Sequence, residues 1–133
     1  MSEIPRRLIE GIKGEITETV TEEMTAIAVG SGTLHVFGTP AAAALMEKTA
    51  YKSVIDFLGP GTNSVGSRTE MDHLAPTPVG SKVTCVTDLV EVERRKLTFK
   101  FSITDNVGEI AKGTHVRVVV NTEKFLENAK RRI

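Results

Sequence analysis

The sequence predicts an α+β domain in which one long helix packs against a curved antiparallel sheet. The first observation is an apolar stretch from about Pro40 to Leu58, which begins at Thr39-Pro40 and ends at Gly59-Pro60-Gly61. Proline is favoured in the first turn of a helix, and glycine is favoured just past the end. The second observation is that strand-like runs precede this stretch and four more follow it with short turns between them. One helix covering a sheet is a two-layer α+β architecture.

The elements follow in chain order. Residues 11–20 alternate well enough for a first strand, with Ile16 and Val20 on its buried face. Residues 24–29 fit either a short helix or extended chain, and residues 34–37 lead as extended chain to the helix, for which Thr39 is a suitable N-cap. The strands expected after the helix, and a short final helix, are residues 64–74, 82–93, 97–104, 109–121 and 123–132.

Two of these strands show a clear period of two. The strand at 82–93 places Val83, Cys85, Thr87 and Leu89 on one face. The strand at 97–104 alternates just as cleanly, with Leu97, Phe99, Phe101 and Ile103 on its apolar face. Such alternation is typical of strands with one face on a core and one in water. A sheet of this kind leaves an edge strand open, so pairing with a second copy is expected.

Composition bounds the function. The 133 residues, with 40% hydrophobic and 26% charged side chains, suit one globular domain spanning residues 1–133. Seventeen basic residues balance seventeen acidic ones, which gives no support for binding nucleic acid or an anionic membrane. The basic cluster Lys130-Arg131-Arg132 is expected to be a solvated tail.

The cysteine content and the apolar stretches of the sequence indicate the cellular compartment and limit the kinds of metal site. Cys85 is the only cysteine, which excludes an intramolecular disulfide and a multi-cysteine zinc site and favours a core thiol. The first seven residues lack the pattern of a signal peptide. The uncharged stretch between Met24 and Met46 is broken by glycines and a proline, so it is not expected to span a membrane. A cytoplasmic protein is expected.

Glu47 stands in the middle of the apolar helix. At helical spacing it shares a stripe with Ala43, Ala50, Val54 and Phe57. A second stripe, which carries Lys48, Lys52 and Asp56, is the natural water-facing side. Glu47 is therefore expected to point into the core, where a carboxylate needs partners or a raised pKa. Residues of that kind are candidates for chemistry.

Thr39 and His73 complete the candidate constellation. On its strand His73 shares a face with Val65, Ser67, Thr69 and Met71, while Arg68, Glu70 and Asp72 take the other face. If His73 lies within reach of Glu47, the pair could stabilise an ionic state or pass a proton. The alternatives are a structural histidine, a plain helix cap at Thr39, and a Glu47 on the rim of the core or in a buried ion pair. The sequence holds no GxSxG, P-loop, HExxH or dinucleotide motif.

Four segments of the chain form a series with a characteristic order and spacing: Val36-Phe37-Gly38-Thr39-Pro40, Ala43 to Glu47, Gly66-Ser67-Arg68-Thr69, and His73 to Gly80. Together they resemble the hotdog-fold acyl-CoA thioesterases similar to fluoroacetyl-CoA thioesterase. The resemblance extends roughly from Lys13 to Val120. It implies a central helix wrapped by an antiparallel sheet, and a homodimer with active sites at its interface. The sequence leaves open whether two such dimers pair into a tetramer.

The resemblance also implies hydrolysis of acyl-CoA thioesters, with Thr39, Glu47 and His73 catalytic and the backbone of Gly66 near the thioester. That chemistry requires no cofactor or metal, since CoA is part of the substrate. A Gly66 amide could donate to the oxyanion, and Glu47 could act as nucleophile or as general base. Arg68 and Arg117 are candidates for the CoA phosphates, and the alanine-rich helix start suits a short acyl chain. The alternatives are a non-catalytic acyl-CoA-binding module and an acyl-thioester hydratase or dehydratase on the same scaffold.

Overall fold

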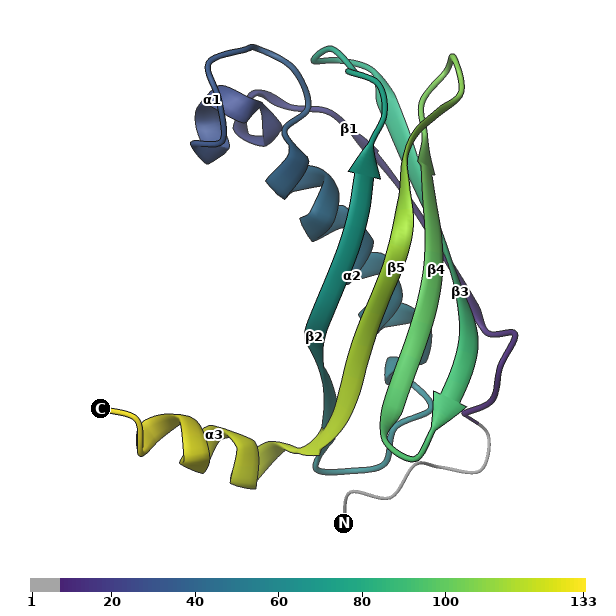
Figure 1. Ribbon diagram of the computed structural model, residues 1–133, viewed down its shortest axis with the longest axis vertical. Coiled ribbons are helices and arrows are strands. Elements are labelled where there is room, and N and C mark those ends of the chain that lie inside the picture. Colours follow the sequence, from purple (N-terminus) through teal and green to yellow (C-terminus); the bar gives the residue numbers. More distant parts are fainter. Residues whose placement is uncertain (1–7) are drawn as a thin grey trace.

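The computed structural model describes residues 8–133 and places one long helix across a face of a five-stranded antiparallel sheet (Figure 1). The strands lie in the order β1-β3-β4-β5-β2. Their bounds are β1 Lys13–Thr19, β2 Thr62–His73, β3 Lys82–Glu93, β4 Lys96–Thr104 and β5 Glu109–Asn121. The helices are α1 Ala26–Val29, α2 Thr39–Ile55 and α3 Thr122–Lys130, and a 3-10 turn, Glu22–Met24, precedes α1.

The core lies between α2 and the sheet. Two groups of side chains fill it, and the apolar positions of β3 and β4 supply the sheet side of both, as their alternation predicts. The buried residues of α2 are Ala42, Leu45, Met46, Thr49, Ala50 and Val54. Cys85 of β3 is buried in the same core, as expected for a core thiol. Burial raises the pKa of this thiol to about 11.

Most element boundaries predicted from the sequence are confirmed within two residues, and β3 and β5 agree at both ends. The segment that fits two conformations, residues 24–29, contains the short helix α1. The N-cap of α2 is Gly38, where no side chain caps the helix, so the prediction that Thr39 is the N-cap is wrong. Thr39 is instead the first helical residue, and its hydroxyl is free for another partner.

The prediction that Glu47 points into the core is also wrong. Its side chain is 49% exposed, because the buried face of α2 is rotated toward Met46 and Ala50 and leaves Glu47 at its border. The fold alone therefore does not force this carboxylate into apolar surroundings.

A β-bulge at Ser67 changes the face that the first half of β2 presents. Gly66 pairs with Arg117 and Thr69 pairs with His115, so three steps on β2 match two on β5. Opposite residues of an antiparallel pair point to the same face, so Gly66 and Thr69 both face α2. Thr69 and Met71 share the face of His73 as predicted, whereas Val65 lies on the other face and Ser67 is the bulged residue.

One long edge of the sheet is open. Strand β2 is the last in the sheet, and its residues Gly66 to Glu70 are exposed. Figure 1 shows no strand beyond β2 on that side, and α3 projects past it. The described residues contain no helix with the length and apolarity needed to cross a bilayer. The expectation about a signal peptide concerns residues 1–7, outside the described part.

Candidate functional site

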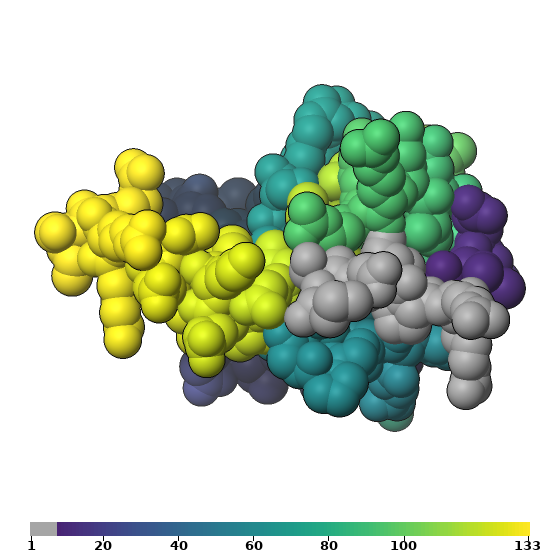
Figure 2. All heavy atoms as spheres, turned by 90° about the horizontal axis from the view of Figure 1, so that it is seen from below, coloured from purple at the N-terminus to yellow at the C-terminus, as the bar shows by residue number. Residues whose placement is uncertain are grey.

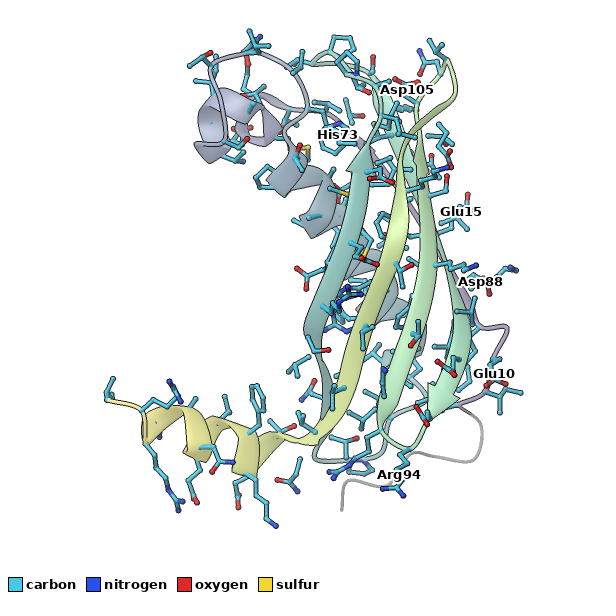
Figure 3. The ribbon with its side chains drawn as sticks, in the orientation of Figure 1. Glu10, Glu15, His73, Asp88, Arg94 and Asp105 are labelled. Atoms are coloured by element: carbon cyan, nitrogen blue, oxygen red, sulfur yellow. The ribbon has the colours of Figure 1, made fainter. Side chains whose placement is uncertain are left out.

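The first part of the candidate site is a hydrogen-bonded pair, Thr39 and His73. Thr39 Oγ1 lies 2.7 Å from Nδ1 of His73. The start of α2 supplies the hydroxyl and the last residue of β2 supplies the imidazole, which lies where that strand ends (Figure 3). The imidazole also packs against the Phe37 ring in a T-shaped arrangement, with a centroid distance of 6.4 Å and an interplanar angle of 79°. Nε2 of His73 is buried and has no hydrogen-bond partner among residues 8–133.

This pair lines an open hollow of about 540 Å³. The rest of its wall is the segment between α1 and α2 and the turn after β2, and it comprises Ala26, Ser31 to Leu34, Val36 to Gly38, and Leu74 to Pro76. A hydroxyl bonded to an imidazole beside a mainly apolar hollow is the arrangement of a nucleophile and its general base. The structure thus brings together two of the three residues that the sequence groups as a candidate site, although the partner expected for His73 was Glu47.

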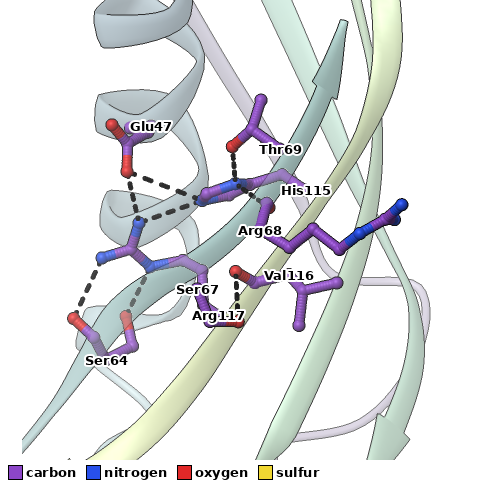
Figure 4. Close-up of polar contacts among 8 residues, drawn as sticks. All are labelled: Glu47, Ser64, Ser67, Arg68, Thr69, His115, Val116 and Arg117. Atoms are coloured by element: carbon purple, nitrogen blue, oxygen red, sulfur yellow. Dashed lines mark hydrogen bonds and ion pairs between the residues drawn. The ribbon is translucent and has the colours of Figure 1, made fainter.

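The second part is a polar cluster around Glu47 (Figure 4). Oε2 of Glu47 lies 3.7 Å from Nη1 of Arg117 and 4.0 Å from Nε2 of His115. Gly66 makes this approach possible, since a Cβ at that position would lie only 2.6 Å from the same oxygen. A side chain at Gly66 would displace the carboxylate, so the bulge and the glycine together give Glu47 its place.

His115 is held as a neutral imidazole. Its Nδ1 lies 3.0 Å from the carbonyl oxygen of Arg68 and 2.7 Å from Oγ1 of Thr69. A carbonyl only accepts, so Nδ1 carries the hydrogen, and Nε2 accepts from Nη1 of Arg117 at 3.1 Å. Burial and then the Arg117 charge lower the pKa of His115, against a smaller opposing effect of Glu47.

Arg117 is fixed by the start of β2. Its Nε donates to Ser64 Oγ at 2.8 Å and its Nη2 donates to the Ser64 carbonyl at 2.9 Å. The side chain is 8% exposed, and burial lowers its pKa against the raising effect of Glu47. Nη1 of Arg117, which also donates to His115, faces Glu47. This favours a role for Arg117 in holding that carboxylate over the phosphate contact expected from the sequence.

The structure does not join the two parts within one chain. Among residues 8–133 no hydrogen bond or ion pair connects Glu47 with Thr39 or His73. Eight residues of α-helix separate Thr39 from Glu47, a rise of about 12 Å. Arg68, the other arginine expected to bind CoA, lies on the outer face of β2 and pairs with Glu70 at 3.0 Å.

Sequence reasoning missed His115 and Ser64. The signal for His115 was present, because it stands two residues from Arg117 in a strongly β-branched strand and therefore shares its face. Ser64 gave no signal, since its role depends on the bulge. No group of three metal-ligating side chains occurs in residues 8–133.

The sheet wrapped on one helix, with a hydroxyl–imidazole pair at the helix start, defines the class of hotdog-fold thioesterases. Residues 20–123 match the family model described as fluoroacetyl-CoA-specific thioesterase. The chain belongs to this family and is an acyl-CoA thioesterase.

Individual relatives agree with this assignment. The chain is 41% identical over 96 residues to the fluoroacetyl-CoA thioesterase of Streptantibioticus cattleyicolor, which covers 72% of this chain and 68% of the relative. A crystal structure of the fluoroacetyl-CoA thioesterase FlK superposes with a TM-score of 0.90 at 30% identity, over 95% of this chain and 98% of that one. A thioesterase superfamily member from Thermus thermophilus gives a TM-score of 0.86 at 26% identity, over 96% and 93% of the two chains.

Proposed function

We propose that the protein hydrolyses small acyl-CoA thioesters in the cytoplasm as a homodimer, with Thr39 and His73 of one subunit and Glu47 of the partner subunit in each site. The observation that carries this is the Thr39–His73 hydrogen bond of 2.7 Å, whose imidazole has a second, buried nitrogen without a partner in residues 8–133. A buried imidazole N–H is stabilised by an acceptor. Glu47, half exposed and already oriented by Arg117, supplies a carboxylate for it.

The open edge of β2 supports the shared site. Two β2 strands that pair antiparallel about a two-fold axis near Thr69 would set Arg68 of each opposite Glu70 of the other. The same register brings the His73 end of one strand beside the middle of the other, where Gly66 and Glu47 lie. Edge pairing also removes the row of unpaired backbone groups that an exposed edge leaves.

In the proposed reaction the Thr39 hydroxyl oxygen attacks the thioester carbonyl carbon. Its proton passes to Nδ1 of His73, and the partner's Glu47 stabilises the imidazolium through the Nε2 hydrogen. The carbonyl oxygen becomes an oxyanion, for which the Gly66 amide is a candidate donor; one such donor contributes roughly 3 kcal/mol. The carbon–sulfur bond breaks, the CoA thiolate takes the proton, and water, activated by His73, then releases the acid from Thr39. These reaction steps require no cofactor.

The alternative route on the same residues has Glu47 attack the carbonyl or activate water directly. The two routes differ at Thr39. If Thr39 is the nucleophile, Thr39→Ala loses turnover, Thr39→Ser keeps part of it, and a rapid quench of the slow variants traps acyl-Thr39 by mass. An acyl group trapped on Glu47, or turnover retained by Thr39→Ala, supports the second route.

The deciding experiment mixes two inactive variants. Thr39→Ala and Glu47→Gln subunits, with different tags, are co-expressed, and the mixed dimer is purified and assayed for thiol release. In a shared site one of its two centres has Thr39 from one subunit and Glu47 from the other, so about half of the wild-type activity returns. A mixed dimer as inactive as its parents would show that each chain builds its own site, and a monomeric active protein would overturn the proposed assembly.

The substrate proposed is an acyl-CoA with a short acyl group. The hollow beside Thr39 is lined by Val36 and Phe37, and the relative that is 41% identical is a fluoroacetyl-CoA thioesterase, which has a two-carbon acyl group in its substrate. A panel of acetyl-, fluoroacetyl-, butyryl-, octanoyl- and benzoyl-CoA tests this by kcat/KM. A preference for octanoyl- or benzoyl-CoA would contradict the proposal.

A further inference from the structure

Helix α3 begins at the open edge of the sheet and leaves the body of the molecule there. The Thr122 amide donates to the Gly61 carbonyl at 3.0 Å, and Nδ2 of Asn63 donates to Thr122 Oγ1 at 2.7 Å. Asn121 caps the helix by accepting from the Lys124 amide at 2.9 Å. These bonds attach the start of α3 to the start of β2, and from there the helix extends past that strand (Figure 1). Seen from below, the C-terminal residues stand clear of the rest of the chain (Figure 2).

The chain has exposed apolar side chains at both ends of β2. At the α3 end, Phe125 is 43% and Leu126 is 56% exposed, and with Ala129 they form one stripe of the helix. At the other end, around the hollow of Thr39 and His73, three larger side chains are more than half exposed, namely Ile27, Leu34 and Leu74. Clustered exposed apolar side chains of this kind mark surfaces that bind something.

A two-fold axis through the middle of β2 brings these two surfaces together. Thr62, which pairs with Asn121 before α3, lies at one end of the strand, and His73 lies at the other. In antiparallel pairing about Thr69, Thr62 of one subunit falls level with residues 74–76 of its partner, which line the hollow. Helix α3 of one subunit then extends over the mouth of the other subunit's hollow. This step depends on the proposed dimer.

The CoA phosphates still need cations at that mouth. Arg117 is buried and bonded to Ser64, and Arg68 is paired with Glu70. Helix α3 ends at Lys130, and the turn after it keeps Arg131 in a helical conformation and bonds the Arg132 amide to the Ala129 carbonyl at 3.1 Å. With helical spacing continued through this turn, Lys130 and Arg132 flank the apolar stripe, one on each side, whereas Lys124 and Arg131 lie on the opposite face. Arg131 also already pairs with Glu127. Cations beside an apolar contact suit CoA, which joins charged phosphates to an uncharged pantetheine arm that carries methyl and methylene groups.

We propose that α3 of each subunit docks its apolar stripe beside the partner's hollow and binds the phosphates of CoA there with Lys130 and Arg132. The C-terminal cluster is then part of a substrate site contributed across the dimer, where the sequence alone predicted a solvated tail. The acyl group and the reacting carbonyl remain with Thr39, His73 and Glu47.

The test compares two substrates with the same acyl group. Acetyl-CoA carries the phosphates, and S-acetyl-N-acetylcysteamine carries the same thioester without them. In Lys130→Gln/Arg132→Gln we expect KM for acetyl-CoA to rise about tenfold with kcat retained, since two phosphate contacts are lost. KM for the phosphate-free thioester is expected to stay unchanged. Lys124→Gln/Arg131→Gln removes the same charge from the same helix on its other face, and it is expected to leave both KM values unchanged.

Mixed dimers test which subunit supplies the helix. In one, a Thr39→Ala subunit with wild-type α3 pairs with a Lys130→Gln/Arg132→Gln subunit, so the one live hollow faces a wild-type helix from the partner. Its KM for acetyl-CoA is expected to equal the wild-type value. In the other, all three changes are on one subunit, and the live hollow of the wild-type subunit faces the altered helix, so KM is expected to rise.

The outcomes separate the two levels of inference. An active dimer whose KM for acetyl-CoA does not respond to Lys130→Gln/Arg132→Gln, or responds equally to the control pair, overturns the role of α3 and leaves the shared site standing. A KM change that follows the helix of the same subunit also overturns it. Inactivity of the mixed dimer whose one wild-type Thr39 and one wild-type Glu47 lie on different subunits counts against the shared site itself.

Discussion

Replacing Gly66 by alanine separates the position of the Glu47 carboxylate from the stability of the fold. The added Cβ would lie 2.6 Å from Glu47 Oε2, where ordinary contact begins at 3.4 Å, so the carboxylate must move by roughly 0.8 Å. The atom displaced is the end of a flexible side chain, and the other close neighbour, Cε1 of His115, lies at 3.3 Å. The cost to folding is therefore small, and alanine loses less backbone entropy on folding than glycine does.

The cost to catalysis is expected to be large. Misplacing a catalytic group by about 1 Å can lower a rate about 100-fold, which corresponds to about 2.7 kcal/mol of transition-state stabilisation. We expect kcat/KM for a small acyl-CoA to fall by about that factor, while Tm stays within about 4 °C of wild type. The amide of residue 66 is retained in the variant, so a loss of activity reports on Glu47 and not on the proposed oxyanion donor.

Gly59→Ala is the matched control, because a Cβ at Gly59 has no neighbour within 4 Å. Thiol release and thermal unfolding are measured for both variants under the same conditions. Wild-type kcat/KM in Gly66→Ala would refute the reasoning, since it would mean that the position of this carboxylate relative to Arg117 and His115 does not matter. A large fall in Tm would also contradict it, because the displaced atom would then not be free to move.

Three further predictions concern the buried polar groups. The pKa of His115 is lowered in the folded protein, so as pH falls the unfolded chain binds a proton at this residue before the folded chain does. The free energy of unfolding should therefore decrease below about pH 6.5. In urea titrations His115→Asn should make the free energy of unfolding depend less on pH. Arg117→Lys loses the fork that binds Ser64, so unfolding in urea should show a loss of about 2 kcal/mol and thiol release should show a lower kcat. With a thiol pKa of about 11, Cys85 should resist a disulfide reagent at pH 8 in the native protein and react once urea unfolds it; rapid native labelling would contradict its burial.

The fold was readable from the sequence where a pattern repeats. Local rules predict strands from the alternation in β3 and β4, and they predict the ends of α2 from Pro40 and Gly59. The bounds of these three elements were predicted close to those observed. Thr39 and His73 were also selected as site candidates, but their contact with each other was not predicted, because the expected partner of His73 was Glu47. Local periodicity was sufficient for these elements.

The errors have one physical origin, which is that rotation and register are set by packing. Glu47 was assigned to the core from a helical stripe, but small residues such as Ala43 and Ala50 fix the buried face of a helix only loosely. The faces of Val65 and Ser67 were assigned from strict alternation, which the bulge at Ser67 interrupts. Arg117 was assigned to the CoA phosphates by its charge, whereas its guanidinium is buried, donates to Ser64 and lies beside Glu47.

These corrections change how the site is understood. A carboxylate buried by its own helix would be expected to act within its own chain, but Glu47 lies at the border of the core, oriented by Arg117 and freed of steric hindrance by Gly66. Its placement is therefore built into one chain before any partner arrives, and so is the Thr39–His73 bond. In the proposed dimer, association has only to bring two preorganised halves together, and such preorganisation of charge and hydrogen bonds is the main source of rate enhancement in many enzymes.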